Sequence, residues 1–311
     1  MSYIRRFSSA AMFALAASVA MTPVAHAETP PAVKIAVATG QTPAAKLVTP
    51  RPAALNERAA SSITAAAASA AFAQATPASP PCSAPAELAK LGQPLTRTAR
   101  LLAGGLPVKI IALGSSSTAG AGASSPAASY PSRLAVELAE KFPNHPFTVL
   151  NRGVNGEEAK EMLARLETGV IAEKPDLILW QVGTNAVLRD YALPSTFSLI
   201  DQGVARLKAT GADVVLIDPQ FAPKVIAKPA TANMVDLLAL KAKQYNVNVF
   251  QRFAVMRYWR RSQGIPFETF ISSDQLHMND WSYACVAKVL SVAIAEAATR
   301  PTASAAARAV R

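Results

Sequence analysis

Histidine, cysteine and aromatic residues are scarce in this chain of 311 residues. It has three histidines and two cysteines, and aromatic residues make up 6 % of it. Metal sites in proteins are usually built from several histidine, cysteine or carboxylate ligands, so this is a poor ligand set. Neither a glycine-rich dinucleotide fingerprint nor a phosphate-binding loop with its lysine occurs. The sequence therefore predicts no metal and no cofactor.

The first 27 residues have the pattern of a secretory signal. Arg5 and Arg6 precede an apolar stretch, A-M-F-A-L-A-A-S-V-A-M, that is too short to span a bilayer, and the segment closes on the small-residue cleavage pattern A-H-A. We predict cleavage after Ala27 and a periplasmic or secreted protein. The alternative is an N-terminal membrane anchor.

Composition divides the rest of the chain into three parts. Residues 28–81 are mostly Ala, Pro, Thr and Ser, which cannot bury enough apolar surface to offset chain entropy, so we expect a disordered linker. Over residues 82–298, apolar runs alternate with amphipathic stretches, at a length that suits one domain. Residues 299–311 look like a short, basic, flexible tail.

Basic residues outnumber acidic ones by 31 to 20, which gives a formal net charge of +11. They are scattered, apart from a cluster of Arg252, Arg257, Arg260 and Arg261. An exported protein seldom meets nucleic acid, so we expect no such partner. We expect this charge to form a simple solvated face, and an anionic envelope polymer or a membrane surface is the alternative partner.

The two cysteines, Cys82 and Cys285, flank nearly the whole predicted domain. In an oxidising compartment an even pair favours a disulfide. Such a bridge closes a very long loop and would stabilise the fold by roughly 4–5 kcal/mol in the chain-entropy model. Two free buried thiols are the alternative.

The domain contains five apolar runs with the composition of buried strands. They are rich in β-branched residues, are continuous rather than alternating, and cover residues 108–113, 147–151, 176–182, 213–218 and 247–250. Amphipathic helical patterns separate them. Strand and helix in alternation predict right-handed crossovers, and so an α/β fold: a three-layer α/β/α sandwich around a mainly parallel five-stranded sheet.

Chemistry in such a sheet is expected just after the strands, because ligands collect outside their carboxyl ends. The first three runs are followed there by G-S-S-S-T-A-G, R-G-V-N-G-E-E and G-T-N-A-V-L-R-D. His145 precedes a strand and so belongs to the opposite edge. His277 comes late in the chain, three residues after Asp274, whose carboxylate can turn back to accept the Nδ1 proton. A serine, this histidine and this aspartate would make a hydrolytic triad.

These segments resemble the sequence blocks of the SGNH, or GDSL-type, family of esterases and lipases. Residues 114–120 are similar to the family's G-D-S-L-T-x-G, which maps the nucleophile to Ser116. The family's glycine and asparagine map to Gly156 and Asn185, and its D-x-x-H block to Asp274 and His277. The resemblance covers residues 108 to about 295 and implies a flavodoxin-like SGNH hydrolase fold.

Three positions depart from the family pattern. Ser115 replaces an aspartate of the first block, Ala186 replaces the aspartate after Asn185, and Met278 replaces the usual proline after His277. None of the replaced residues is a triad member, so the departures concern loop geometry. No G-x-S-x-G motif surrounds any serine, which speaks against the other common serine-esterase architecture.

Attack on an ester carbonyl also requires donors for the developing oxyanion. We expect the backbone N–H groups of Ser116 and Gly156 and the amide of Asn185 to form this oxyanion hole. Val187, Leu188 and Arg189 follow shortly after Asn185 and are candidates for lining the substrate pocket. For Arg189 we expect a surface salt bridge with Asp190 or another acid rather than contact with an anionic substrate, which is the alternative.

The sequence thus predicts an exported serine esterase that works through an acyl-enzyme in an open, shallow site. Its substrate would be an ester-bearing small molecule or an acylated glycan of the envelope, and we expect a monomer. Two alternatives remain open. One is an O-acyltransferase with the same triad, and the other is a non-catalytic module that binds the envelope.

Overall fold

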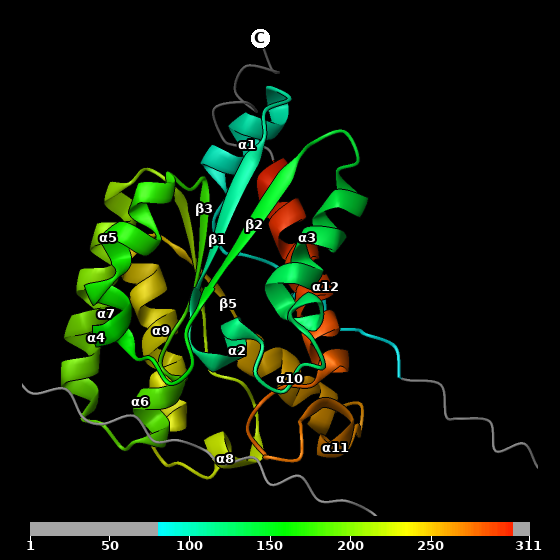
Figure 1. Cartoon of the computed structure of the whole chain (residues 1–311). Coiled ribbons are helices and arrows are strands. Elements are labelled where there is room, and N and C mark those ends of the chain that lie inside the picture. The colour runs from blue at the N-terminus through cyan, green and yellow to red at the C-terminus, as the bar shows by residue number, and fades with distance from the viewer. Residues whose placement is uncertain (1–79, 301–311) are drawn as a thin grey trace, which may run out of the picture. The chain divides into compact units, whose positions relative to one another are not determined.

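The computed structural model describes residues 80–300 and shows an α/β fold around one parallel sheet (Figure 1). The strand order is β2-β1-β3-β4-β5, which is the flavodoxin-like order. The strands are β1 (Val108–Gly114), β2 (Phe147–Gly153), β3 (Leu177–Gln181), β4 (Asp213–Ile217) and β5 (Asn248–Phe250). The five apolar runs of the sequence are these five strands, and the predicted fold class is confirmed.

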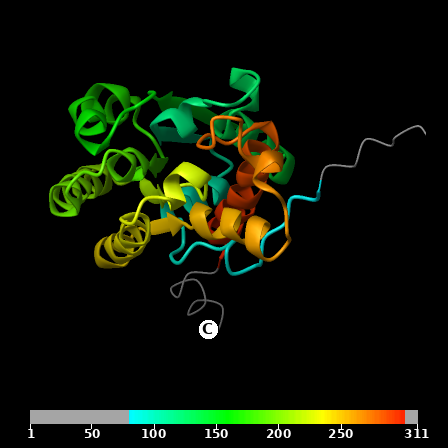
Figure 2. The ribbon, with the colours of Figure 1, turned by 90° about the horizontal axis from the view of Figure 1, so that it is seen from below.

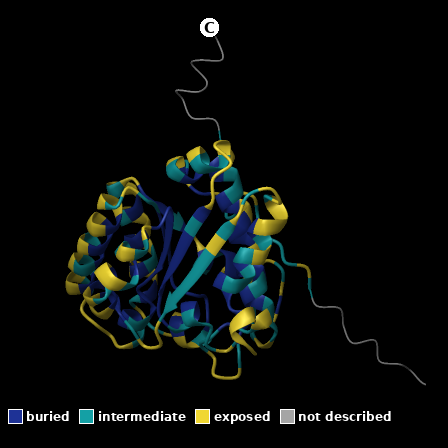
Figure 3. Ribbon diagram, turned by 45° about the horizontal axis from the view of Figure 1, so that its top comes forward, coloured by how far each residue is buried: buried dark blue, intermediate teal, exposed yellow. Residues whose placement is uncertain are grey.

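Burial explains why the strands read as continuous apolar runs. Every residue of β3 is buried, and so are all but one of β1, because helices cover both faces of the sheet. β2 is an edge strand and is only half-buried along most of its length, as Figure 3 shows. β1 pairs with β2 in register from Val108 with Phe147 to Gly114 with Gly153, so the two strands end side by side.

Helices form a layer on each face of the sheet (Figures 1 and 2). One core is built from α3 (Tyr130–Lys141), α10 (Arg252–Arg261) and α12 (Asp280–Thr299), and the other from α4 (Ala159–Ala164), α7 (Leu193–Ala209) and α9 (Thr231–Tyr245). α1 (Thr96–Ala103) lies at the amino edge of the sheet.

Short helices gather at the carboxyl edge of the sheet, which is the lower edge in Figure 1. They are α2 (Ser116–Ala119), α6 (Thr184–Leu188), α8 (Pro223–Ile226) and α11 (Phe267–Phe270). α2 begins soon after β1 ends and α6 soon after β3 ends, so the segments that follow these two strands are held in short helices.

One predicted helix is broken in the structure. The helical pattern that follows β2 forms α4, then α5 (Leu166–Gly169) and the 3-10 turn η2 (Ile171–Glu173). The break falls at Arg165, whose side chain turns back to Glu157 and to the carbonyl of Arg152. The spacing of apolar residues carries no information on such side-chain contacts. The sequence therefore predicts one continuous helix between β2 and β3.

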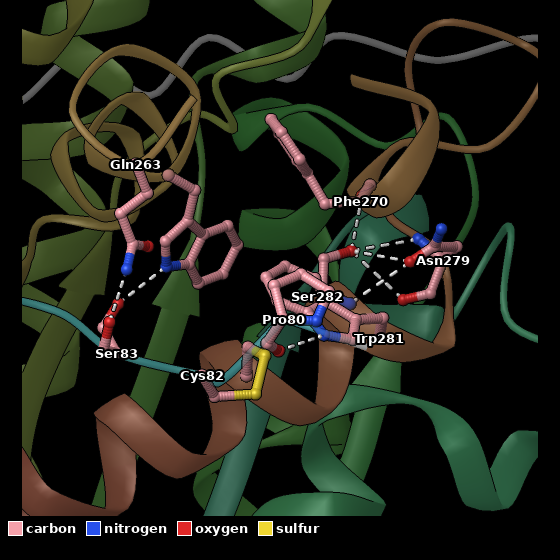
Figure 4. Close-up of a disulfide and its surroundings, with 10 residues drawn as sticks. Pro80, Cys82, Ser83, Gln263, Phe270, Asn279, Trp281 and Ser282 are labelled. Carbon is pink, nitrogen blue, oxygen red and sulfur yellow. Dashed lines mark hydrogen bonds between the residues drawn. A yellow bond between two sulfur atoms is a disulfide. The ribbon is translucent and has the colours of Figure 1, made fainter. Parts of the chain in front are cut away.

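The predicted disulfide between Cys82 and Cys285 is present and attaches the N-terminal segment of the domain to α12. Two indoles strengthen the attachment: Trp281 Nε1 donates to the Pro80 carbonyl at 3.1 Å and Trp259 Nε1 donates to that of Ser83 at 2.9 Å. Figure 4 shows the disulfide with this segment beside α12.

α12 is a core helix. It is long and apolar enough to cross a membrane by length and composition, but 67 % of its most apolar window is buried inside the fold. Arg300 follows it and donates to the carbonyl of Leu91 at 2.7 Å. The predicted signal peptide, the linker up to residue 79 and the tail from residue 301 lie outside the described residues.

Candidate active site

The three consecutive serines after β1 have different environments. Ser115 and Ser117 are buried, with 2 % and 1 % of their surface exposed, whereas Ser116 is half-buried at the first position of α2. Ser115 donates from its backbone N–H and its hydroxyl to Gln181 Oε1, at 2.9 and 3.0 Å. Ser116 is therefore the one of the three that a substrate can approach.

His277 lies directly beside Ser116. Its Nε2 is 2.8 Å from Ser116 Oγ, and its Nδ1 is 2.5 Å from Asp274 Oδ2. The loop between α11 and α12 carries both His277 and Asp274 to the carboxyl edge of the sheet, where β1 delivers Ser116. The three predicted triad residues are thus brought together from opposite ends of the domain, and their catalytic roles stay predictions.

The Asp274 carboxylate is held ionised by several donors. Burial acts to raise its pKa, but hydrogen bonds from the His277 ring, from the backbone N–H groups of His277 and Leu276 and from the Ser272 hydroxyl outweigh that effect and hold the pKa well below its ordinary value. An ionised carboxylate accepts the Nδ1 proton of His277, so Nε2 is left to accept the proton of the serine hydroxyl.

The histidine loop owes its shape to short-range hydrogen bonds. Asp274 Oδ1 accepts two backbone N–H groups further along the chain, which closes the turn. Ser272 N–H donates to the His277 carbonyl at 2.8 Å, and Ile271 pairs with Met278 in an antiparallel bridge. Met278 is fully buried, so the residue in place of the family's proline anchors the loop in the core.

Gly156 and Asn185 lie on neighbouring segments after β2 and β3. Gly156 has φ +80°, a conformation that favours glycine. The side-chain amide of Asn185 donates to the carbonyl of Glu157, the residue after Gly156, at 2.8 Å. This bond uses one of the two N–H groups of the amide. Within residues 80–300 the backbone N–H groups of Ser116 and Gly156 have no acceptor, so they are available as donors.

Of the three residues named as candidates for lining the substrate pocket, Arg189 makes the expected salt bridge with an acidic residue and also contacts the glycine loop. It donates to the Gly156 carbonyl at 2.9 Å and forms an ion pair with Glu158. Val187 is fully buried in the core that also contains residues of α4, α7 and α9, which argues against a substrate contact. Leu188 is partly buried against the opposite core.

Two residues that support this edge of the sheet escaped the sequence analysis. Gln181, at the end of β3, accepts both hydrogen bonds from Ser115. Asn151, near the end of β2, donates to the Thr118 carbonyl at 2.8 Å and accepts from the Gly153 N–H at 2.9 Å. The sequence could have indicated both residues, because each is an isolated amide side chain at or near the end of an apolar run.

The part of the chain described here, residues 80–300, contains no group of three His, Cys, Asp or Glu side chains that could hold a metal ion. The groups that meet beside Ser116 are a hydroxyl, an imidazole, a carboxylate and neutral N–H donors.

Comparison with known proteins identifies the family. The profile of the non-GDSL lipase-like family matches residues 81–300. The chain belongs to this family. The name agrees with the altered first block, where serines occupy the Asp and Leu positions of the GDSL-type pattern. The expected relationship to lipases and esterases is confirmed at the level of this family. The family profile does not support the more specific assignment to the GDSL-type family.

Among curated proteins, an acetylxylan esterase from Geobacillus stearothermophilus is 40 % identical over 53 residues, which are 17 % of this chain and 24 % of that protein. The chain thus matches about a quarter of that relative's length.

Solved structures of esterases share the fold. A two-domain esterase active on acetylated mannans superimposes with a TM-score of 0.56 at 20 % identity, over 68 % of this chain and 56 % of the other. A catalytic mutant of an acetylxylan esterase from Geobacillus stearothermophilus has a TM-score of 0.51 at 18 % identity, over 60 % and 96 % of the two chains. LAE5, an alpha/beta hydrolase enzyme from the metagenome of Lake Arreo, has a TM-score of 0.52 at 21 % identity, over 61 % of this chain and 98 % of the other.

Proposed function

We propose that the protein is an exported serine esterase that hydrolyses O-acyl esters through an acyl-enzyme. The observation that carries the proposal is the pair of contacts at His277, 2.8 Å to the Ser116 hydroxyl and 2.5 Å to the Asp274 carboxylate. Hydroxyl, imidazole and carboxylate in this order form the hydrolytic triads that recur on unrelated folds.

In the proposed reaction, Ser116 Oγ attacks the ester carbonyl carbon while His277 Nε2 takes the hydroxyl proton. The bond to the alcohol oxygen then breaks, and His277 gives the proton to that oxygen, which leaves the acyl group on Ser116. Water attacks the acyl-enzyme with His277 again as the base, and the carboxylic acid and free Ser116 are released. Asp274 orients the imidazole and stabilises its charged form in both steps.

The oxyanion of each tetrahedral intermediate would be bound by the backbone N–H groups of Ser116 and Gly156 and by the second N–H of Asn185. Two of these donors have no other acceptor among the described residues, and the third keeps one N–H uncommitted. Loss of one such donor should raise the barrier by roughly 3–4 kcal/mol.

We propose an SGNH-type site in spite of the family's non-GDSL name. Ser116, Gly156 and Asn185 follow β1, β2 and β3, and His277 lies in the loop before α12, so the four residues occur in the order of the four SGNH blocks. The changed Asp position of the first block has a local substitute, because Ser115 bonds to Gln181 and so fixes the turn before the nucleophile.

For the substrate we propose an acetylated polysaccharide. Enzymes of this fold act on acetylated mannans and on acetyl-xylooligosaccharides. A cavity of about 520 Å³ adjoins the histidine loop and is lined by Phe267, Ile271, Ser272 and Gln275 among others. Its volume lies in the range of roughly 300–1,000 Å³ that small-molecule sites have, and its mixture of apolar and hydroxyl or amide groups suits a sugar unit.

The test uses an active-site-directed fluorophosphonate on the full-length protein. We expect one adduct, on Ser116, that disappears in the Ser116→Ala and His277→Ala variants. Turnover of p-nitrophenyl acetate and release of acetate from acetylated xylan or mannan should fall by at least about 10³-fold in Ser116→Ala. Ser115→Ala and Ser117→Ala should be far milder, and equal losses at all three serines would reject Ser116 as the nucleophile.

The same experiment separates the alternatives. A protein that takes no label anywhere and releases no acetate would be a binding module rather than an enzyme. Transfer of acetyl groups to an added oligosaccharide, in preference to water, would identify an O-acyltransferase. Export is tested independently by N-terminal sequencing of the protein recovered from the periplasm or medium, where we expect Glu28 as the first residue.

A further inference from the structure

Arg252, the first residue of α10, has none of its surface exposed. The sequence placed it in a basic surface cluster with Arg257, Arg260 and Arg261, and for Arg252 that prediction is wrong. The side chain is among the largest that the fold buries completely. A buried guanidinium is costly unless its donors are satisfied, and an apolar side chain would fill the same volume without that cost. The acceptors of its hydrogen bonds therefore indicate why a charged residue occupies this buried position.

The guanidinium donates to three acceptors. Arg252 Nε donates to the Asp218 carbonyl at 2.9 Å, one terminal nitrogen donates to Ser117 Oγ at 3.1 Å, and the other donates to Gln220 Oε1 at 3.1 Å. Ser117 directly follows the proposed nucleophile, Ser116, in α2. Arg252 therefore connects the nucleophile's helix to the segment that follows β4.

Gln220 extends the connection to two further segments. Its Oε1 also accepts from Thr184 Oγ1 at 3.1 Å, and its Nε2 donates to the Leu276 carbonyl at 3.3 Å. Gln220 is itself buried, with 1 % of its surface exposed. One guanidinium and one amide thus join Ser117, Thr184 and Leu276, which come from three separate parts of the chain.

Each of these three residues is the chain neighbour of a residue in the proposed site. Ser117 follows Ser116, Thr184 precedes Asn185, and Leu276 precedes His277. We propose that Arg252, acting with Gln220, is the positioning residue that sets the placement of Ser116, Asn185 and His277 relative to one another. The inference rests on the proposed esterase function, because it assigns Arg252 a task within that site.

The residue type fits this task. The guanidinium is a planar fork that donates in fixed directions, whereas the ammonium of lysine is a point charge on a flexible stem. Alignment matters because the barrier depends steeply on geometry: a misplacement of about 1 Å in an active site can cost roughly 100-fold in rate. A contact that aligns the reacting groups should affect kcat far more than KM.

The test compares the full-length wild type with Arg252→Lys and Gln220→Met. Lysine keeps the charge without the fork, and methionine removes the amide without adding a charge. We expect kcat for p-nitrophenyl acetate to fall by about 10- to 100-fold, with KM changed by less than about 3-fold. Crystal structures of the variants should show Ser116 Oγ and His277 Nε2 moved beyond the hydrogen-bond range of roughly 2.6–3.2 Å.

The matched control is Asn248→Leu. Asn248 is a buried amide at the start of β5, 4 % exposed, and it bonds to the backbone N–H and carbonyl of Gln93 at 2.7 and 3.1 Å. The Asn248→Leu variant loses these two hydrogen bonds, where Gln220→Met loses three. The loss falls at the amino edge of the sheet, away from the site. We expect a lowered Tm with kcat intact, which separates positioning from general stability.

Wild-type kcat and an unchanged distance between Ser116 and His277 in both variants would overturn the inference. If Arg252→Lys fails to fold, Gln220→Met decides the question by the same measurements, because it leaves the buried charge in place. A wild type without ester turnover would refute the proposed function, and the crystallographic distances would then decide the positioning role by themselves.

Discussion

Gly122 lies directly against His277. A Cβ added to Gly122 would stand 3.0 Å from the His277 Cβ and 2.4 Å from the Met278 carbonyl oxygen. Gly122 also has φ +86°, in the left-handed region where other residues are strained. The segment after α2 and the loop before α12 fit together because the residue at this contact has no side chain.

Gly122→Ala should therefore displace the histidine loop from Ser116. We expect kcat for a small ester to fall by about 10- to 100-fold and Tm to fall as well. Gly211→Ala is the control, since Gly211 has φ +75° but nothing within 4 Å of an added Cβ. Both variants carry a backbone strain of about 1–2 kcal/mol, so a loss of kcat in Gly122→Ala alone identifies the contact as the cause. Equal kcat values in the two variants would contradict it.

Arg189 gives a second prediction, because it holds the Gly156 carbonyl and the Glu158 carboxylate together. Arg189→Met should release the glycine loop and lower kcat by about 10-fold, to the same extent for neutral and for anionic esters. A KM increase confined to anionic esters would instead make Arg189 a substrate contact. Lys228→Met, which removes the ion pair with Asp190, is the control and should leave both constants unchanged.

The fold was predictable because its signal is local. Each strand is a continuous apolar run, and parallel strands buried on both faces have that pattern wherever they occur. The approach of His277 to Ser116 could be anticipated as well, since all parallel strands end at one edge of the sheet and His145 precedes its strand. Chain order and residue type are enough to predict this approach.

The buried polar contacts were not predictable in the same way. Arg252 belongs to the same basic segment of the sequence as Arg257, Arg260 and Arg261. The residues next to it in the sequence do not indicate that segments distant in the chain bury its side chain. Val187 lies two residues after Asn185, but the turn of α6 directs it into the core. α6 has only five residues, too few for a periodic pattern to show which of its faces meets the core. Arg252 is the first residue of α10, and its burial depends on contacts with Ser117, Asp218 and Gln220, which lie far from it in the chain.

The disulfide should account for much of the domain's stability. It joins residues 203 positions apart, and closing a loop of that size stabilises by about 5 kcal/mol in the chain-entropy model. We expect the double variant Cys82→Ala and Cys285→Ala to have a lower unfolding free energy by up to that amount in urea titrations. Dithiothreitol should lower the urea midpoint of the wild type and leave that of the double variant unchanged. A wild type indifferent to the reductant would show that the bond contributes little.

Asp218 should make the stability of the domain depend on pH near neutrality. Burial raises its pKa from 3.8 to about 7, against the opposing effects of the Phe253 N–H and the Arg252 charge. Asp236 and Arg257 line a cavity beside it. Between the two pKa values the folded state holds a proton that the unfolded state has lost, so this group's stabilising contribution is full at low pH and is lost as the pH rises through about 7.

Asp218→Asn removes this titration and leaves an oxygen that accepts the Phe253 N–H. We expect the Tm of the wild type, relative to that of the variant, to fall between pH 5 and pH 8. Asp274 does not contribute in this window, because its lowered pKa makes its own effect appear only in acid. All other titratable groups are the same in both proteins, so the difference between the two Tm curves isolates Asp218. Parallel curves would mean that the buried carboxyl keeps an ordinary pKa, and that Arg252 compensates fully for its burial.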